Sequence, residues 1–119
     1  EPDLIAGVAT AAMEMLEQVP DGLDAIFVPV GGGSIAAGTA LVVKSLSPHT
    51  KVYGVQAENA PAMHHAWTTG EKRPFAVTGT IADGLAVRVP VVVRSSRRSL
   101  ACSSCCVFEV VGPDPVPQA

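Results

Sequence analysis

One stretch of sequence decides the fold: DAIFVPVGGGSIAAGTALVVKSLSPHTKVYGVQ, residues 24–56. Residues 24–30 form a short apolar run rich in branched side chains, which is typical of a strand buried on both faces of a parallel sheet. Apolar residues recur at helical spacing from Ile35 to Leu46, and Lys51 to Gln56 again favours a strand. Strand, helix and strand within about thirty residues make a βαβ unit. The sequence therefore predicts an α/β fold with a doubly wound, mainly parallel sheet.

Three consecutive glycines, Gly31 to Gly33, join the first of these strands to the helix. Glycine leaves backbone N–H groups uncovered, at a point where the helix N-terminus presents partial positive charge. Ser34 is the predicted N-cap, and its hydroxyl can donate one more hydrogen bond to an anion. The loop therefore predicts a phosphate site, with a plain tight turn as the alternative.

The kind of phosphate stays open at this point. Gly31, Gly33 and Ala36 match the looser dinucleotide pattern G-x-G-x-x-A, so a nicotinamide or flavin domain is a rival. Such a domain needs an acidic residue at the end of the next strand, where this chain has Gln56, with Glu58 two residues beyond. No Lys-Ser or Lys-Thr follows directly after a glycine of this loop, which excludes a Walker loop.

The flanking segments extend the α/β pattern. Residues 1–19 are predicted to form a helix that Pro20 and Gly22 stop. A short helix is predicted from Pro61 to Trp67, with Gly70 placed to end it. The segment TIADG, residues 80–84, predicts a tight Asp-Gly turn.

Composition excludes several classes of partner. The net charge is −3 with only eight Lys and Arg, which argues against nucleic acid, because such binding needs a clustered basic footprint. No uninterrupted apolar run is long enough to span a bilayer, and the first residues do not resemble a secretion signal. A cytoplasmic protein without membrane or nucleic-acid partners is therefore expected.

The chain changes character near Pro90. Residues 91–119 hold three of the eight basic residues and all three cysteines, which is unlike the preceding segment. We divide the chain into an α/β portion, residues 1–90, and an atypical tail, residues 91–119. Two readings stay open for the tail: an edge strand followed by a disordered end, or a foreign segment such as a shifted reading frame produces. In either case we expect poor packing after Pro90.

The run from Asp24 to Met63, followed by TIADGLAV, resembles the serine/threonine dehydratase and serine racemase group of fold type II pyridoxal-phosphate (PLP) enzymes. The resemblance covers roughly residues 1–90. It implies a turn beside the cofactor ring, at Asp83 and Gly84. It also implies a loop that binds the PLP phosphate, formed by Gly31, Gly32, Gly33, Ser34 and Ile35. Dehydratases usually have a fourth glycine at Ser34, whereas serine is similar to the loop of tryptophan synthase β.

The resemblance implies an ammonia-lyase that converts threonine or serine to a 2-oxo acid, with an amino acid as substrate and a homo-oligomer as the full-length form. The family's lysine that binds the PLP aldehyde lies upstream of this region, and Lys44, Lys51 and Lys72 are not equivalent to it. We therefore expect no catalytic residue in this chain and no dehydration by the chain alone. A non-catalytic phosphate-binding or interaction fragment, or a dinucleotide-binding oxidoreductase domain, is the alternative.

No metal site is expected. The family's cation carboxylates correspond to Gln56 and Ala62, neither of which is acidic. Cys102 and Cys105 have C-x-x-C spacing, but zinc needs two more ligands, which the tail lacks. His64 and His65 point about 100° apart on a helix, so a shared task is not expected of them.

Overall fold

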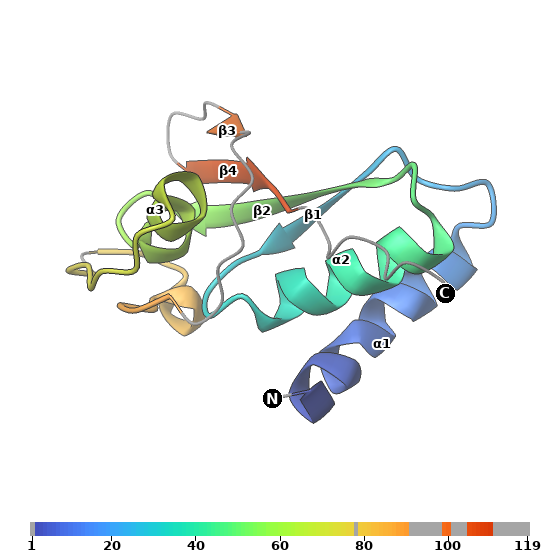
Figure 1. Ribbon diagram of the computed structural model, residues 1–119, viewed down its shortest axis with the longest axis horizontal. Helices are drawn as coiled ribbons and strands as arrows, with labels where there is room; N and C mark the ends of the chain where they lie inside the picture. Colours follow the sequence, from blue (N-terminus) through green and yellow to red (C-terminus); the bar gives the residue numbers. More distant parts are fainter. Residues whose placement is uncertain (1, 78, 91–98, 101–104, 111–119) are drawn as a thin grey trace, which may run out of the picture.

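The computed structural model describes residues 2–77, 79–90, 99–100 and 105–110. Figure 1 shows their arrangement, with helices packed along a twisted sheet. None of the helices in these residues is long and apolar enough to cross a membrane. In chain order the elements are α1 (Pro2–Gln18), β1 (Ala25–Pro29), α2 (Ser34–Leu46), β2 (Lys51–Ala57), α3 (Ala62–Thr69), a 3₁₀ turn (Asp83–Leu85), β3 (Ser99–Leu100) and β4 (Cys105–Glu109).

The sheet has the strand order β1-β2-β4-β3. β1 and β2 are parallel, with Ala25 opposite Lys51 and Pro29 opposite Val55, and α2 connects them. The predicted βαβ unit and the α/β class are confirmed. β4 runs antiparallel to both β2 and β3, so the antiparallel pairs come from the chain beyond Pro90.

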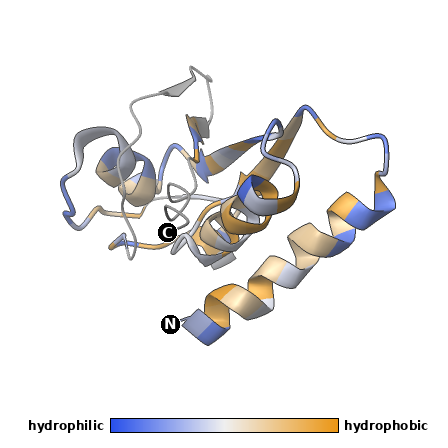
Figure 2. Ribbon diagram, turned by 45° about the vertical axis from the view of Figure 1, so that its right-hand side comes forward, coloured by the Kyte–Doolittle hydropathy of each residue, from blue (hydrophilic) through white to orange (hydrophobic). Residues whose placement is uncertain are grey.

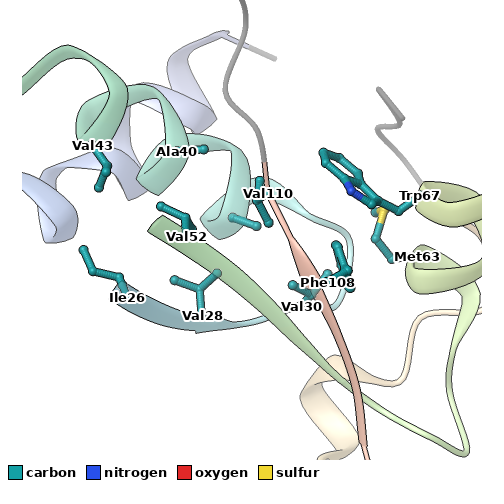
Figure 3. Packing of buried hydrophobic residues seen from close by; sticks show 11 residues of the cluster. Ile26, Val28, Val30, Ala40, Val43, Val52, Met63, Trp67, Phe108 and Val110 are labelled. Carbon is teal, nitrogen blue, oxygen red and sulfur yellow. The ribbon is translucent and has the colours of Figure 1, made fainter. Parts of the chain in front are cut away.

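One face of the sheet carries the core, because alternate residues of a strand point to the same side. Ile26, Val28 and Val30 lie on this face at 1–5% exposure, beside Val52 of β2. The other face is open: Phe27 is 62% exposed there, and its ring stacks on Tyr53. Figure 3 shows how the core side chains meet. They come from β1, β2, α2, α3 and β4, and include Ala40, Val43, Met63, Trp67, Phe108 and Val110.

The first helix packs on α2 rather than on the sheet. Figure 2 shows α1 lying along α2 at the edge of the molecule. Gly38 permits this close approach, since a Cβ there would lie 3.1 Å from backbone atoms of Ile5 and Ala9. Ala9 and Ala12 are buried against Val42 in this contact.

The helix ends differ from the predictions by one residue. Gly33, not Ser34, is the N-cap of α2, because only glycine readily adopts the left-handed conformation found there (φ 97°, ψ −2°). Pro61 is the N-cap of α3 rather than its first residue. Gly70 ends α3 with φ 80°, as predicted. The Asp-Gly turn is a single 3₁₀ turn that includes Leu85.

The prediction that the chain packs poorly after Pro90 is wrong for part of the tail. Residues 105–109 form β4, and Phe108, which lies opposite Gly54, is 1% exposed. Gly54 makes room for this ring, since a Cβ on it would lie 2.8 Å from the Phe108 Cζ atom. The Cys102 side of the C-x-x-C pattern lies outside the described residues. The division of the chain at Pro90 stays a prediction.

Candidate functional site

The glycine loop leaves the carboxyl end of β1 and enters α2 directly. Val30 donates its N–H to Val55 of β2 (2.9 Å), and Gly31 follows at once. At the other end of the loop, Ala37 makes the first helical hydrogen bond to Gly33 (2.9 Å). The N–H groups of the helical residues before Ala37 have no partner inside α2, because the first turn of a helix provides none.

The described residues show no backbone hydrogen bond donated by Gly31, Gly32 or Gly33. Their N–H groups are thus available at the positive end of the α2 dipole, where an anion is stabilised. Ser34 is partly buried and makes no side-chain cap, so its hydroxyl is not used by the helix. This arrangement favours the phosphate site at Gly31 to Ile35, which stays a prediction.

The chain around the Asp-Gly turn lies against the start of the glycine loop. A Cβ on Gly31 would approach Leu85 and Val87 at 3.2 and 3.3 Å, so these residues pack on its bare Cα. Asp83 and Gly84 are exposed in the preceding part of the same turn. The sequence suggested nothing for Leu85 or Val87. The placement of Asp83 and Gly84 beside a cofactor stays a prediction.

The end of the loop rests on α3. A Cβ on Gly33 would lie 2.9 Å from the terminal methyl of Met63, which is itself buried. Met63 is the second residue of α3. The position of this short helix therefore determines how much room the glycine loop has.

Gln56 connects the loop to the same helix. Its side chain is 1% exposed at the carboxyl end of β2. The side-chain amide nitrogen donates to the Val30 carbonyl (3.3 Å), and the side-chain oxygen accepts the backbone N–H of His64 (2.9 Å). Sequence reasoning treated Gln56 only as a missing acid and overlooked this bridge, because its two partners are distant in the chain.

His64 and His65 belong to different environments on α3. Burial lowers the pKa of His64 from its ordinary value of 6.5, and neighbouring His65 lowers it further. The His64 ring lies 5.8 Å from the ring of Phe108, whereas His65 packs edge-on against Phe75 and accepts a hydrogen bond from Arg73 (3.3 Å). The two rings therefore pack against different partners, and the absence of a shared task stays a prediction.

An open hollow of about 660 Å³ adjoins this region at the carboxyl ends of β1 and β2. Ligands of open α/β sheets bind outside these strand ends. Leu85 lines the hollow and also contacts Gly31, so the hollow borders the glycine loop. Its other walls include Pro29, Val55, Glu58, Asn59 and Thr80.

The lysines lie away from the loop. Lys44 is in the last turn of α2, ten residues after Ser34, which is about 15 Å along the helix axis. Lys51 pairs with Ala25, six residues before Gly31, which is about 20 Å along a strand. Lys72 is exposed beyond the C-terminal end of α3. Lys44 and Lys51 therefore lie far from a phosphate held at the loop.

The described residues contain no cluster of His, Cys, Asp and Glu suited to a metal ion. The carboxylates on α1 are also separate from the site: Glu14 is exposed and accepts a hydrogen bond from Gln18 (3.3 Å).

Comparison with known proteins agrees with this geometry. A family model described as "Pyridoxal-phosphate dependent enzyme" matches residues 1–105. The chain belongs to this family. Its cofactor class, pyridoxal phosphate, is the one that the resemblance implies, and this cofactor carries a phosphate group of the kind that the glycine loop predicts. No part of the comparison favours a dinucleotide-binding oxidoreductase.

Individual relatives are threonine dehydratases and racemases. The biosynthetic L-threonine dehydratase of Burkholderia multivorans is 47% identical over 89 residues, which cover 75% of this chain and 18% of that enzyme. A threonine deaminase isoform from Solanum lycopersicum superimposes with TM-score 0.70 at 36% identity, over 76% of this chain and 26% of that one. Serine racemase from Dictyostelium discoideum gives TM-score 0.63 at 39% identity, over 78% and 27%. The chain thus spans about a quarter or less of the length of these relatives.

Proposed function

We propose that this chain is the phosphate-holding portion of a PLP-dependent ammonia-lyase that acts on threonine or serine. The observation that carries the proposal is the glycine loop, Gly31 to Gly33, whose unused N–H groups face the start of α2. Family membership supports PLP as the molecule that carries the phosphate. The relatives named threonine dehydratase and threonine deaminase support ammonia-lyase activity as the reaction.

Binding at the loop rests on the backbone and not on charged side chains. The N–H groups of Gly31 to Gly33, with those of Ser34 and Ile35 in the first turn, donate to phosphate oxygens. The Ser34 hydroxyl adds a donor. Gly31 suits this place because it has no side chain: Leu85 and Val87 occupy the space that a Cβ would need.

When bound, PLP supplies an electron sink for the α-carbon of an amino acid. The residues of this chain fix one end of the cofactor, and the turn with Asp83 and Gly84 limits the space beside the ring. Proton transfer needs a group within hydrogen-bond reach of the substrate. Lys44 and Lys51 lie about 15–20 Å from the loop by element length, so we assign no catalytic residue here.

A cytoplasmic location, a homo-oligomeric full-length protein and a preference between threonine and serine belong to this proposal as expectations. They follow from the resemblance and from composition. About three-quarters of the length of the solved relatives lies outside the match with this chain. The lysine that the mechanism needs is expected in that part of the full-length protein.

The test is a calorimetric titration with pyridoxine 5′-phosphate, which keeps the phosphate but has no aldehyde to react with surface lysines. The chain is expected to bind this compound and not pyridoxine. A Gly32→Leu substitution in the loop is expected to abolish binding, while Gly7→Leu in exposed α1, where a Cβ meets nothing within 4 Å, leaves it intact. Equal binding of pyridoxine and its phosphate would refute the proposal, and preferential binding of NAD would favour the dinucleotide alternative.

A further inference from the structure

We infer that Gln56 is a positioning residue for the phosphate loop: its side-chain amide orients the first loop N–H and holds the helix that supports the last glycine. The inference rests on the proposed phosphate site and adds a residue to it. Gln56 is one of the largest fully buried side chains among the described residues, and it is polar. A buried amide is retained only when its hydrogen bonds are made, because burial without them is costly.

Gln56 acts first on the peptide bond between Val30 and Gly31. A trans peptide is planar, with its C=O and N–H pointing in opposite directions. The Gln56 amide nitrogen donates to the Val30 carbonyl at 3.3 Å. By holding this carbonyl toward β2, Gln56 directs the Gly31 N–H to the opposite side of the peptide plane. The orientation of one phosphate donor is thereby tied to a side chain on another strand.

Gln56 also binds the first turn of α3. The Gln56 oxygen accepts the N–H of His64, the third residue of this helix, at 2.9 Å. The helix has no side-chain cap of its own at Pro61, so Gln56 satisfies one of its terminal donors from β2. The residue before His64 is Met63, whose methyl limits the space at Gly33. Gln56 thus reaches both ends of the loop.

The two partners dictate the chemistry of the side chain. The Val30 carbonyl requires a donor and the His64 N–H requires an acceptor, so the site needs one of each on a planar group. A neutral carboxylic acid meets this requirement. A carboxylate would place an acceptor against the Val30 carbonyl, unless a cation lies between the two oxygens, as the family's cation site at this position implies. Burial and the Val30 carbonyl disfavour the charged form, whereas the His64 N–H favours it. Because the first two effects both act against the charge, we expect the pKa of a carboxyl at this position to lie above its usual range.

The test compares phosphate binding by the full chain with binding by the Gln56→Glu variant, using inorganic phosphate between pH 5 and 8. We expect the variant to bind roughly tenfold more weakly at pH 8, and the ratio of the two dissociation constants to approach about one at pH 5. Phosphate and the His64 ring also ionise in this pH range, and His64 is the residue whose backbone N–H binds Gln56. The ratio of the two dissociation constants cancels both effects, because they occur in both proteins. Gln18→Glu on exposed α1 adds the same charge and should follow the unsubstituted chain at every pH.

A Gln56→Met variant separates positioning from packing. Methionine keeps the length but neither donates to Val30 nor accepts strongly from His64, so weaker binding without recovery at low pH is expected. If the Gln56→Glu and Gln56→Met variants bind equally at all pH values, or either binds like the unsubstituted chain at pH 8, the inference is wrong. If the unsubstituted chain itself binds no phosphate, the proposed function fails instead, which is a different outcome.

Discussion

Replacing Gly33 with alanine tests whether the conformation of the loop depends on glycine. Gly33 has φ 97° and ψ −2° at the N-cap of α2. A β-carbon in this left-handed region crowds the backbone, which costs about 1–2 kcal/mol in L-residues. The new methyl would also lie 2.9 Å from the end of the Met63 side chain, which must then move. Both effects act against the folded state.

The expected loss of stability is about 1–2 kcal/mol. Alanine lowers the entropy of the unfolded chain, but at an incompatible φ the strain outweighs that gain. The displacement of a flexible methionine methyl adds little. Gly7 provides the opposite case, since it lies inside exposed α1 and a Cβ there meets nothing within 4 Å. Gly7→Ala should therefore stabilise the chain by about 0.5–1 kcal/mol.

The measurement is urea unfolding of both variants, followed by circular dichroism, with phosphate affinity measured on the same samples. Gly33→Ala should unfold at lower urea and bind phosphate more weakly, while Gly7→Ala should unfold at higher urea with unchanged affinity. The reasoning is refuted if Gly33→Ala is as stable as the unsubstituted chain, because Gly33 would then not need its left-handed conformation.

Three further outcomes are expected. Phe108→Ala should destabilise the fold by about 3 kcal/mol, whereas Phe27→Ala should cost much less, because the Phe27 side chain is 62% exposed. Equal losses of stability in urea unfolding would contradict the packing of β4. Since the pKa of His64 is lowered on folding, the free energy of unfolding should fall as the pH drops below about 6.5, less so in His64→Gln; a flat wild-type profile would contradict this. Purified chain with PLP and L-threonine should release no 2-oxo acid above free PLP, and clear turnover would refute that expectation.

The sequence predicts well the part of the fold that depends on local pattern. β1, α2 and β2 follow from apolar runs and helical spacing, interrupted by glycine and proline. The glycine loop is predicted for the same reason, since Gly31 to Gly33 stand between a strand and a helix. The predicted N-cap of α2 is wrong by one residue. Serine is a common cap, which favours Ser34, but the cap position has a positive φ that glycine adopts readily, so Gly33 occupies it.

Long-range pairing was beyond sequence reasoning. The Cys-rich run around β4 lacks a clear alternation, and its place beside β2 depends on the fit of Phe108 over Gly54. The sequence alone marks Gln56 only as a position where an acidic residue is missing. Its proposed role depends on hydrogen bonds to Val30 and His64, which lie 26 and 8 positions away in the chain. Such bridges appear only when the chain is folded.

The central claim is that the backbone of the glycine loop binds the cofactor's phosphate, and amide resonances measured during a phosphate titration test it most directly. We expect the signals of the loop residues to shift together and to saturate with one affinity; these residues are Gly31, Gly32, Gly33, Ser34 and Ile35. Shifts confined to the opposite end of the sheet, around His49 and Lys51, with the loop unchanged, would contradict it.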